Sequence, residues 1–370
     1  MIRIGYNARI LAHKQTRGLT RYTSQLLKSL SKYNSLELIL FTDTELNQEH
    51  LKDINCAVVE FHGHSETHWN DILLPKKIKE YKIDLFHAPA DRGLPIYSPC
   101  PKVVTIHNSF ERNHWKELFP TLKSRLYYWK HELVNYFASD MIIAVSDTLA
   151  DELIKYKIAP KSKIHRIYPA ASDSFNTLEQ NEDQITLNKY SINRPYILYV
   201  SGYNKNKNVD LLVNAFNESG LGNYELVIVA EKKWDYVLLN EKWNSLKCYS
   251  RIRMLEANDE ELPALYRMAE FFVNPSLWES FSLQIVECFA SGTPLICSNA
   301  SAMPEIAGDA ALYFNPTNKQ ELIASMNKLA GNNSMKIELK EKGERRAKLF
   351  NWDKTAEETF LLYKKLISHG

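Results

Sequence analysis

Two series of short apolar segments, separated by a polar stretch, constrain the fold of this chain more than any other feature. In the first series the apolar segments lie at 2–8, 36–42, 84–89, 102–108 and 141–146. A polar stretch follows at 176–193, and the second series lies at 196–201, 225–230, 252–255, 270–275 and 294–299. Amphipathic helical segments stand between the apolar ones, an alternation typical of parallel sheets covered by helices. The sequence therefore predicts an α/β protein with two doubly wound, Rossmann-like domains.

The length supports two domains, because 370 residues exceed what one hydrophobic core usually contains. We predict an N-terminal domain over 1–175 and a C-terminal domain over 190–353. Residues 354–370 carry apolar side chains at helical spacing and predict a last helix. Domains of this kind bind ligands at the carboxyl ends of their strands, so a cleft between the two is the expected ligand site.

Composition excludes several classes of partner and location. A formal net charge of +2 is too small, and too evenly spread, to indicate a nucleic-acid partner. Five cysteines without a CxxC pair argue against a complete disulfide framework and favour a reducing cytoplasm. No run approaches the ~20 apolar residues that span a bilayer. We therefore expect a cytoplasmic protein that at most lies on a membrane surface.

The stretch WESFSLQIVECFASG, residues 278–292, places two carboxylates around an apolar run. Ser280 and Ser282 are candidate N-caps for a helix that Gly292 would end. The amides at the start of such a helix form a site for phosphate, and Glu279 would precede the helix in the loop. A carboxylate can accept two neighbouring hydroxyls of a ribose or hexose. The alternative is that Glu279 and Glu287 are ordinary helix glutamates paired with basic side chains.

The segment NPSLWESFSLQIVECFASGTPLICSNASAMPEIAGDAALYFNP resembles the signature of retaining nucleotide-sugar glycosyltransferases of the GT-B fold, glycosyltransferase family 4. The residues at motif positions are Glu279, Glu287, Gly292, Pro294, Pro304, Glu305 and Gly308. YVSGYNKNKNVDLLVNAF resembles the family's strand, RKN loop and helix, and TRGLTRYTSQLL and TIHNSF resemble two loops of its first domain. NWDKTAEETFLLY resembles the family's last helix, which crosses back onto the first domain.

The resemblance implies a role for each matching residue. Glu287 would hold the nucleotide ribose and Glu279 the hydroxyls of the donor sugar. Lys207 and the amides near Ser282 and Leu283 would meet the diphosphate. The remaining donor-binding positions that it implies are Gly18, Gly202, Lys205, Arg253 and Met254. His107 would lie near the transferred sugar, so the implied catalytic residues are His107, Lys207 and Glu279.

Several positions depart from the family's motif. The FGL of the family reads Phe281-Ser282-Leu283 here, and its RKN reads Asn206-Lys207-Asn208. Lys205 supplies a charge in place of the missing arginine, but without the planar guanidinium fork. These departures motivate an alternative function, a catalytically weak homologue that binds nucleotide sugar or glycan as a partner subunit. Fold alone cannot separate the two functions.

We expect no cofactor and no metal ion, because no Asp-x-Asp occurs to hold a divalent cation against a diphosphate. The histidines at 62, 64 and 68 are interpreted as a polar surface loop rather than a metal cluster. Residues 121–138 form a basic and aromatic segment. A packed helix with a solvated charged face is the favoured interpretation, and peripheral contact with an anionic membrane is the alternative.

The favoured function is a retaining, metal-independent transferase for a growing bacterial surface glycan. Its partners would be a nucleoside diphosphate sugar donor and a glycan or lipid-linked oligosaccharide acceptor. Mannose from GDP-mannose is the favoured donor, because TRGLTRYT is most similar to the mannosyltransferase branch. A lipid-linked acceptor would place the protein at the inner face of the cell membrane. The acceptor, the linkage position and the oligomeric state are not predicted.

Overall fold

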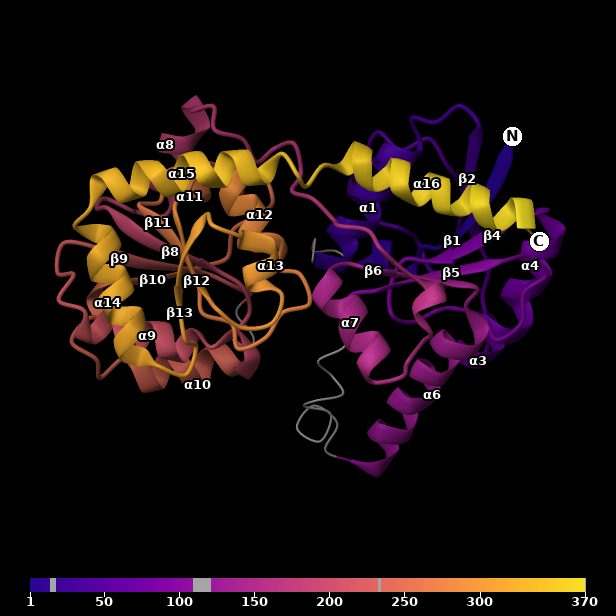
Figure 1. Cartoon of the computed structure of the whole chain (residues 1–370), viewed down its shortest axis with the longest axis horizontal. Helices are drawn as coiled ribbons and strands as arrows, with labels where there is room; N and C mark the ends of the chain where they lie inside the picture. Colours follow the sequence, from indigo (N-terminus) through magenta and orange to yellow (C-terminus); the bar gives the residue numbers. More distant parts are fainter. Residues whose placement is uncertain (14–17, 109–120, 232–233, 370) are drawn as a thin grey trace. The chain divides into compact units, whose positions relative to one another are not determined.

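The computed structural model describes residues 1–13, 18–108, 121–231 and 234–369. The side chains at 127–133, 136, 234–236 and 369 lie outside that description. The chain forms two compact units (Figure 1). Unit 1 contains Met1–Pro169 and Asn351–Gly370, and unit 2 contains Ala170–Phe350. Our expected boundaries were 175 and 190 for the central linker and 353 for the end of the second domain.

Unit 1 contains a seven-stranded parallel sheet with the order β3-β2-β1-β4-β5-β6-β7. The strands are β1 (Ile2–Asn7), β2 (Leu36–Thr42), β3 (Ala57–Glu60), β4 (Leu85–Ala88), β5 (Lys102–Ile106), β6 (Met141–Ala144) and β7 (Ile164–Arg166). The helices are α1 (Gly18–Leu30), α2 (Gln48–Leu51), α3 (Glu66–His68), α4 (Leu74–Glu80), α6 (Leu122–Ala138), α7 (Asp147–Lys155) and α16 (Trp352–His369). Short 3-10 or π turns lie at η1 (Arg9–Ala12), η2 (Trp69–Leu73) and η3 (Lys161–Lys163).

Unit 2 contains a six-stranded parallel sheet with the order β10-β9-β8-β11-β12-β13. The strands are β8 (Tyr196–Val200), β9 (Glu225–Val229), β10 (Ile252–Leu255), β11 (Phe271–Asn274), β12 (Leu295–Ser298) and β13 (Ala311–Phe314). The helices are α8 (Asn181–Lys189), α9 (Val209–Glu218), α10 (Trp234–Trp243), α11 (Leu262–Arg267), α12 (Leu283–Ala290), α13 (Met303–Ala307), α14 (Lys319–Ala330) and α15 (Asn333–Ala347). Two 3-10 turns are η4 (Lys205–Lys207) and η5 (Tyr249–Arg251).

Both sheets have the strand order of a doubly wound fold, which confirms the predicted fold class. In each sheet the order reverses next to the first strand of the unit, between β1 and β4 in unit 1 and between β8 and β11 in unit 2. Strands β4 and β11 are buried along their whole length, as the continuous apolar runs predict for strands covered on both faces. Ligands of such sheets bind at the carboxyl ends of the strands, beside this reversal.

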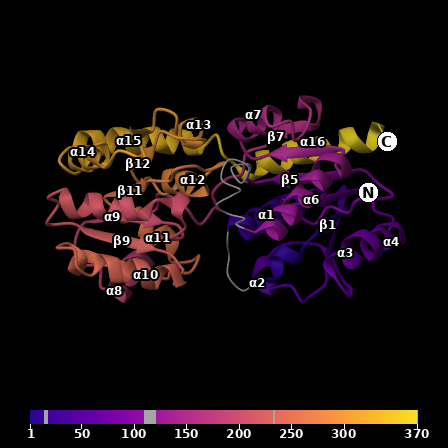
Figure 2. The ribbon, with the colours of Figure 1, turned by 90° about the horizontal axis from the view of Figure 1, so that it is seen from below.

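Helices cover both faces of the sheet in unit 2. Figure 1 shows α8, α11, α12 and α15 on one face and α9, α10 and α14 on the other. Helices α9 and α10 lie side by side in both views (Figures 1 and 2), and the indole nitrogen of Trp243 donates to Asp210 Oδ1 at 3.0 Å. Helix α12 packs on α11, α13 and α15. Helix α12 is therefore mostly buried, and the loop that follows β11 leads into its N-terminus.

The predicted last helix exists as α16 and packs on α1 in unit 1. Tyr363 of α16 bonds with Tyr6 of β1 (2.5 Å between hydroxyl oxygens) and with His87 Nδ1 of β4 (2.5 Å). The other imidazole nitrogen of His87 bonds with Thr105 Oγ1 of β5 at 2.8 Å. Burial lowers the pKa of His87 to about 3, so the imidazole is neutral at pH 7. Three strands therefore bond with the C-terminal helix through one buried chain of polar groups.

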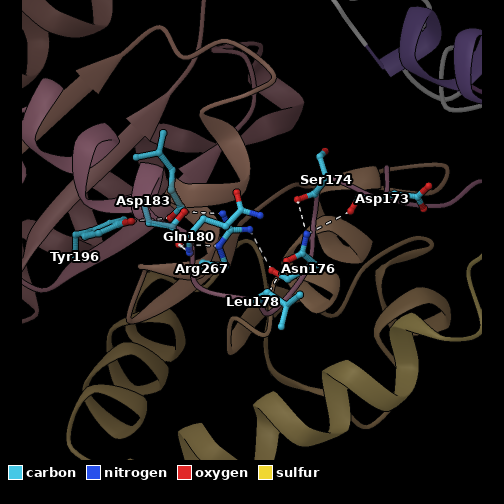
Figure 3. Close-up of polar contacts among 9 residues, drawn as sticks. Asp173, Ser174, Asn176, Leu178, Gln180, Asp183, Tyr196 and Arg267 are labelled. Carbon is cyan, nitrogen blue, oxygen red and sulfur yellow. Dashed lines mark hydrogen bonds and ion pairs between the residues drawn. The ribbon is translucent and has the colours of Figure 1, made fainter. Parts of the chain in front are cut away.

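The polar stretch between the two series of strands contains a helix, α8. The backbone amide of Gln180 donates to Asp183 Oδ2 at 3.2 Å at the start of α8. Arg267 of α11 donates to both carboxylate oxygens of Asp183 and to the carbonyl of Asn176 (Figure 3). The side chains of Arg267 and Asp183 are 6% and 2% exposed. The segment is thus fixed to unit 2 by a buried ion pair rather than by an apolar face.

Candidate functional site

Lys207 and Glu279 form an ion pair beside the point where the strand order of unit 2 reverses. Lys207 lies in η4 after β8, and Glu279 lies in the loop after β11. Lys207 Nζ donates to Glu279 Oε1 at 2.6 Å, and Ser276 Oγ donates to the same oxygen at 2.8 Å. Both charged side chains are mostly buried, at 19% and 11% exposure. The pair gives Glu279 the basic partner that its burial requires.

The η4 loop is held against the Glu279 loop by its own backbone and by Asn208. The carbonyl of Asn206 accepts from the amide of Leu277 at 2.7 Å. Asn208, with φ 56°, donates its side-chain amide to the carbonyls of Pro275 (3.0 Å) and Pro316 (2.8 Å). The backbone of the Glu279 loop is fixed on its far side as well, because Glu279 O accepts from Ser301 Oγ at 2.7 Å. The geometry of the ion pair is therefore set by neighbouring backbone.

Helix α12 begins at Leu283, directly after this loop, and Glu279 precedes it as expected. Ser282 is the N-cap residue, but its side chain does not cap the helix, which corrects our expectation for Ser280 and Ser282. Ser282 Oγ instead accepts from Asn274 Nδ2 at 2.8 Å and donates to Gln284 Oε1 at 3.2 Å. The side chain of the N-cap residue therefore accepts no hydrogen bond from the first amides of α12. Those amides and the positive end of the helix dipole suit an anion.

The predicted helix end at Gly292 is confirmed. Gly292 has φ 68°, its amide donates to Phe289 O at 3.1 Å, and the amide of Thr293 donates to Cys288 O at 3.0 Å. This is the paired bonding of a Schellman C-cap. A side chain at Gly292 would also meet Thr177 Cγ2 at 2.9 Å, so a glycine is required both by the backbone and by the packing of the preceding segment.

Glu287 lies inside α12 and is 1% exposed. Tyr266 of α11 donates its hydroxyl to Glu287 Oε2 at 3.4 Å, and Tyr266 is itself fully buried. The two glutamates around the apolar run therefore have different surroundings. Glu279 is paired with a cation, whereas Glu287 is bonded to a neutral phenol inside the protein. A carboxylate oxygen that accepts from one phenol keeps a second lone pair for a ligand hydroxyl.

Gly202 lies before η4, and Lys205 is the first residue of η4. A side chain at Gly202 would meet no atom within 4 Å, so this position opens to space after β8. Lys205 lines a cavity of about 440 Å³. The cavity wall also includes Tyr203, Asn204, Leu238, Leu239 and Lys242. Neither glutamate lines this cavity.

Arg253 and Met254 lie within β10, an edge strand of the sheet. Arg253 donates from Nη2 to Glu225 Oε1 at 3.0 Å, and Glu225 is the first residue of β9. The side chain of Arg253 is therefore directed toward the amino ends of the strands. Met254 is half-buried and packs on the hydrophobic core of unit 2. Strand β10 ends at Leu255, so neither residue is at its carboxyl end.

His107 and Gly18 lie in unit 1. His107 follows β5, its amide donates to Asp91 Oδ1 at 2.6 Å, and its Nε2 donates to the carbonyl of Pro89 at 3.0 Å. Burial lowers the pKa of His107 to about 4, although the Pro89 bond raises it. The imidazole is therefore neutral, and Nδ1 keeps its lone pair as an acceptor. Gly18 is the first residue of α1 and follows residues outside the described part of the chain.

Sequence reasoning missed two residues that contact predicted site residues, the half-buried Asp91 and the buried Tyr266. Asp91 holds the backbone of His107, and burial raises the pKa of Asp91 to about 6 against hydrogen bonds from His107 and Asn108 that lower it. Tyr266 holds the carboxylate of Glu287. Asp91 stands in a loop and Tyr266 in a short apolar helix, so neither had a local signal. Only the contact of distant segments identifies them.

The described residues of unit 2 therefore combine a lysine, two carboxylates and a helix N-terminus at one end of the sheet. The lysine and the helix amides can bind a diphosphate, and each carboxylate can accept the paired hydroxyls of a sugar ring. Among the residues that the structure describes, no group of three His, Cys, Asp or Glu side chains could hold a metal ion. Within the same described residues, no helix is both long and apolar enough to cross a membrane.

Comparison with known families matches each unit to a separate family model. Residues 182–346 match the model described as "Glycosyl transferases group 1", and residues 16–174 match "Glycosyltransferase Family 4". Together the two matches span most of the chain. Both lie on the units that contain the predicted site residues.

Two curated relatives are bacterial mannosyltransferases. The chain is 28% identical over 302 residues to O-antigen chain mannosyltransferase B of Escherichia coli, a match that covers 78% of this chain and 76% of the relative. It is 25% identical over 304 residues to the serotype-specific mannosyltransferase WbdA of Escherichia coli, covering 73% of this chain but only 37% of that longer protein.

Solved structures match over the full chain. The Anabaena protein Alr3699/HepE, solved in complex with UDP-glucose, superposes with a TM-score of 0.82 at 14% identity and covers 99% of this chain and all of its own. At this identity the likeness concerns the fold alone.

Proposed function

Because this chain belongs to the GT-B glycosyltransferases of glycosyltransferase family 4, we propose that it transfers a hexose with retention of anomeric configuration and without a metal ion. The donor is a nucleoside diphosphate sugar, and the acceptor is a growing glycan. The observation that carries the proposal is the Lys207–Glu279 ion pair beside the N-terminus of α12, one turn from Glu287 along the same loop and helix. This arrangement offers groups for the phosphate, sugar and ribose parts of one molecule.

Each group has a chemical task in this proposal. The bond between the anomeric carbon and the diphosphate oxygen breaks while the acceptor hydroxyl bonds to that carbon, and the hydroxyl proton passes to the departing diphosphate oxygen. Negative charge develops on the departing diphosphate, where Lys207 and the amides of Ser282 and Leu283 stabilise it. Glu279 accepts hydroxyls of the donor sugar, and Glu287 accepts the ribose hydroxyls. The neutral imidazole of His107 accepts a hydrogen bond from a hydroxyl near the reacting carbon.

Mannose from GDP-mannose is the donor that we propose. The names of the relatives support it, since O-antigen chain mannosyltransferase B and WbdA are both mannosyltransferases. The name of the first relative supports a bacterial O-antigen type of glycan as the acceptor, and we propose that a lipid carries this glycan. A lipid-linked acceptor requires that the protein work at the inner face of the cell membrane, and we propose α6 as the helix that contacts the lipid surface.

Calorimetric titration of GDP, UDP and dTDP and their sugars tests the donor site. We expect one nucleotide to bind wild type at micromolar concentration, and the Glu287→Ala variant to lose at least tenfold in affinity, because a charged hydrogen bond to a ribose is worth ~1.5 kcal/mol or more. Glu218→Ala is the control, since this half-exposed carboxylate of unit 2 pairs with Lys319 at 2.6 Å and is not a predicted donor-binding residue.

The outcomes separate the enzyme from a binding subunit. Nucleotide binding followed by release of free sugar or transfer to a lipid-linked glycan acceptor, detected by mass spectrometry, supports the transferase. Binding without any turnover on a panel of acceptors would favour the partner-subunit function that the Ser282 and Asn206 substitutions suggest. If wild type binds none of the nucleotides, the donor site that we propose is wrong.

A further inference from the structure

The carboxylate of Glu287 is held by a side chain that the family motif does not contain. Tyr266 stands at the end of α11, and its hydroxyl donates to Glu287 Oε2 at 3.4 Å. This is longer than the ~2.7 Å typical of such bonds, and hydrogen bonds in ligand-free sites commonly shorten when the ligand binds. Tyr266 is fully buried and Glu287 is 1% exposed, so solvent does not compete for this contact.

The ring of Tyr266 is fixed on two sides by other aromatic rings. It lies edge-on to Phe272 of β11, with ring centroids 5.2 Å apart, and edge-on to Phe175, with centroids 5.8 Å apart. Phe175 belongs to the segment that enters unit 2 ahead of α8, and it is 5% exposed. A ring held in this way cannot rotate out of the protein, so the direction of its hydroxyl is determined by packing.

The backbone of Tyr266 is fixed as firmly as its ring. Its carbonyl accepts from Thr293 Oγ1 at 2.7 Å, directly after the C-terminal end of α12. The next residue, Arg267, donates from Nε to Asp183 Oδ2 at 2.9 Å and from Nη1 to the carbonyl of Asn176 at 3.2 Å (Figure 3). The end of α11 is therefore bonded both to the entering segment and to the far end of the helix that carries Glu287.

We propose that Tyr266 is a positioning residue that orients the carboxylate of Glu287 for the two hydroxyls of a ribose. The inference rests on the proposed donor site and extends it to a residue that touches no ligand. A carboxylate oxygen has two lone pairs, so Oε2 can accept from Tyr266 and from a ribose hydroxyl at the same time. Without the phenol, the carboxylate rotates or binds a water, and the geometry for both hydroxyls is lost.

The experiment compares Tyr266→Phe with Tyr196→Phe in the full chain. Tyr196 is a matched control because it is equally buried and donates its hydroxyl to the same helix, at Leu265 O (2.7 Å), without contacting Glu287. The probes are the nucleoside diphosphate that wild type binds and its 2′,3′-dideoxy analogue. We expect Tyr266→Phe to weaken the ribonucleotide about tenfold and to leave the dideoxy analogue unchanged. Tyr196→Phe should keep the wild-type preference for ribose.

A double mutant separates positioning from general destabilisation. In the Glu287→Ala background, Tyr266→Phe should have no further effect on ribonucleotide affinity, since both changes remove one interaction. A further loss in that background, or a wild-type preference for ribose in Tyr266→Phe, would overturn the inference. The inference also fails separately from the proposed function. If Glu287→Ala loses ribose preference and Tyr266→Phe keeps it, only the role of Tyr266 is wrong.

Discussion

At the scale of single residues, the site depends on a serine where the family motif has a glycine. Ser282 has φ 74°, a left-handed conformation that costs a residue with a side chain ~1 kcal/mol or more. Glycine has no such cost, which explains the glycine of the family motif. Here the serine hydroxyl accepts from the buried side chain of Asn274, and this bond offsets the backbone strain. The departure from the motif is therefore compensated locally.

Two substitutions of Ser282 separate the cost of the backbone strain from the contribution of the Asn274 hydrogen bond. Ser282→Ala loses the Asn274 bond and keeps the strain, so we expect a loss of ~2 kcal/mol in the free energy of unfolding of unit 2. Ser282→Gly also loses the bond but relieves the strain, and should be ~1 kcal/mol more stable than Ser282→Ala. Urea denaturation measures both. Equal stability of the two variants would show that the backbone at Ser282 is not strained.

At the scale of helices and strands, the sequence predicted the central elements and missed those at the edges. The five buried strands expected in each unit are present, but β3, β7 and β13 were not predicted. The apolar run of β3 is only Ala57 to Val59, and three of the four residues of the strand are exposed, so it lacks the longer apolar pattern of the central strands. Helix α8 was missed because it is polar and depends on Arg267, a partner 84 residues from Asp183. Such elements depend on contacts between residues far apart in the sequence, which a local sequence pattern does not reveal.

Helix α6 is the element on which the proposed membrane contact depends. It runs from Leu122 to Ala138, and Leu122 and Leu126 on its first two turns are 72% and 63% exposed. The basic residues Lys123 and Arg125 alternate with them. Exposed leucines next to basic side chains suit the interface of an anionic bilayer. The described exposure of the first turns thus supports a surface contact without showing one.

Liposome co-sedimentation tests this contact. We expect wild type to bind vesicles that contain anionic lipid, less so at high salt, because each basic residue near such a surface contributes ~1 kcal/mol. Replacing Leu122 and Leu126 by serine should lower the partition coefficient about tenfold or more. Leu361→Ser on α16 is the control, since Leu361 is 52% exposed on another helix. Equal binding to neutral and anionic vesicles would contradict the proposal.

At the scale of the whole molecule, the two units differ in how the chain builds them. Unit 2 is one continuous segment, whereas unit 1 needs the last helix of the chain. Ala356 and Tyr363 of α16 are fully buried, and the ring centroid of Phe360 lies 4.8 Å from that of Tyr33, which follows α1. The proposed donor side chains Lys207, Glu279 and Glu287 all belong to unit 2, so donor binding and the folding of unit 1 should be separable.

Fragments of the chain test this separation. We expect residues 170–350 alone to unfold cooperatively and to bind the same nucleoside diphosphate as the full chain, because Lys207, Ser282, Leu283 and Glu287 all lie within them. Residues 1–169 alone should aggregate, since removal of α16 exposes the buried face of α1 and leaves His87 without Tyr363. Joining 351–370 to residue 169 through a short Gly/Ser linker should restore folding, because Thr355 Oγ1 donates to Tyr168 O at 2.6 Å and the two ends are close. Circular dichroism measures the folding of each fragment, and calorimetry measures its nucleotide binding. Nucleotide binding by the full chain, but not by a folded 170–350 fragment, would place part of the donor site in unit 1.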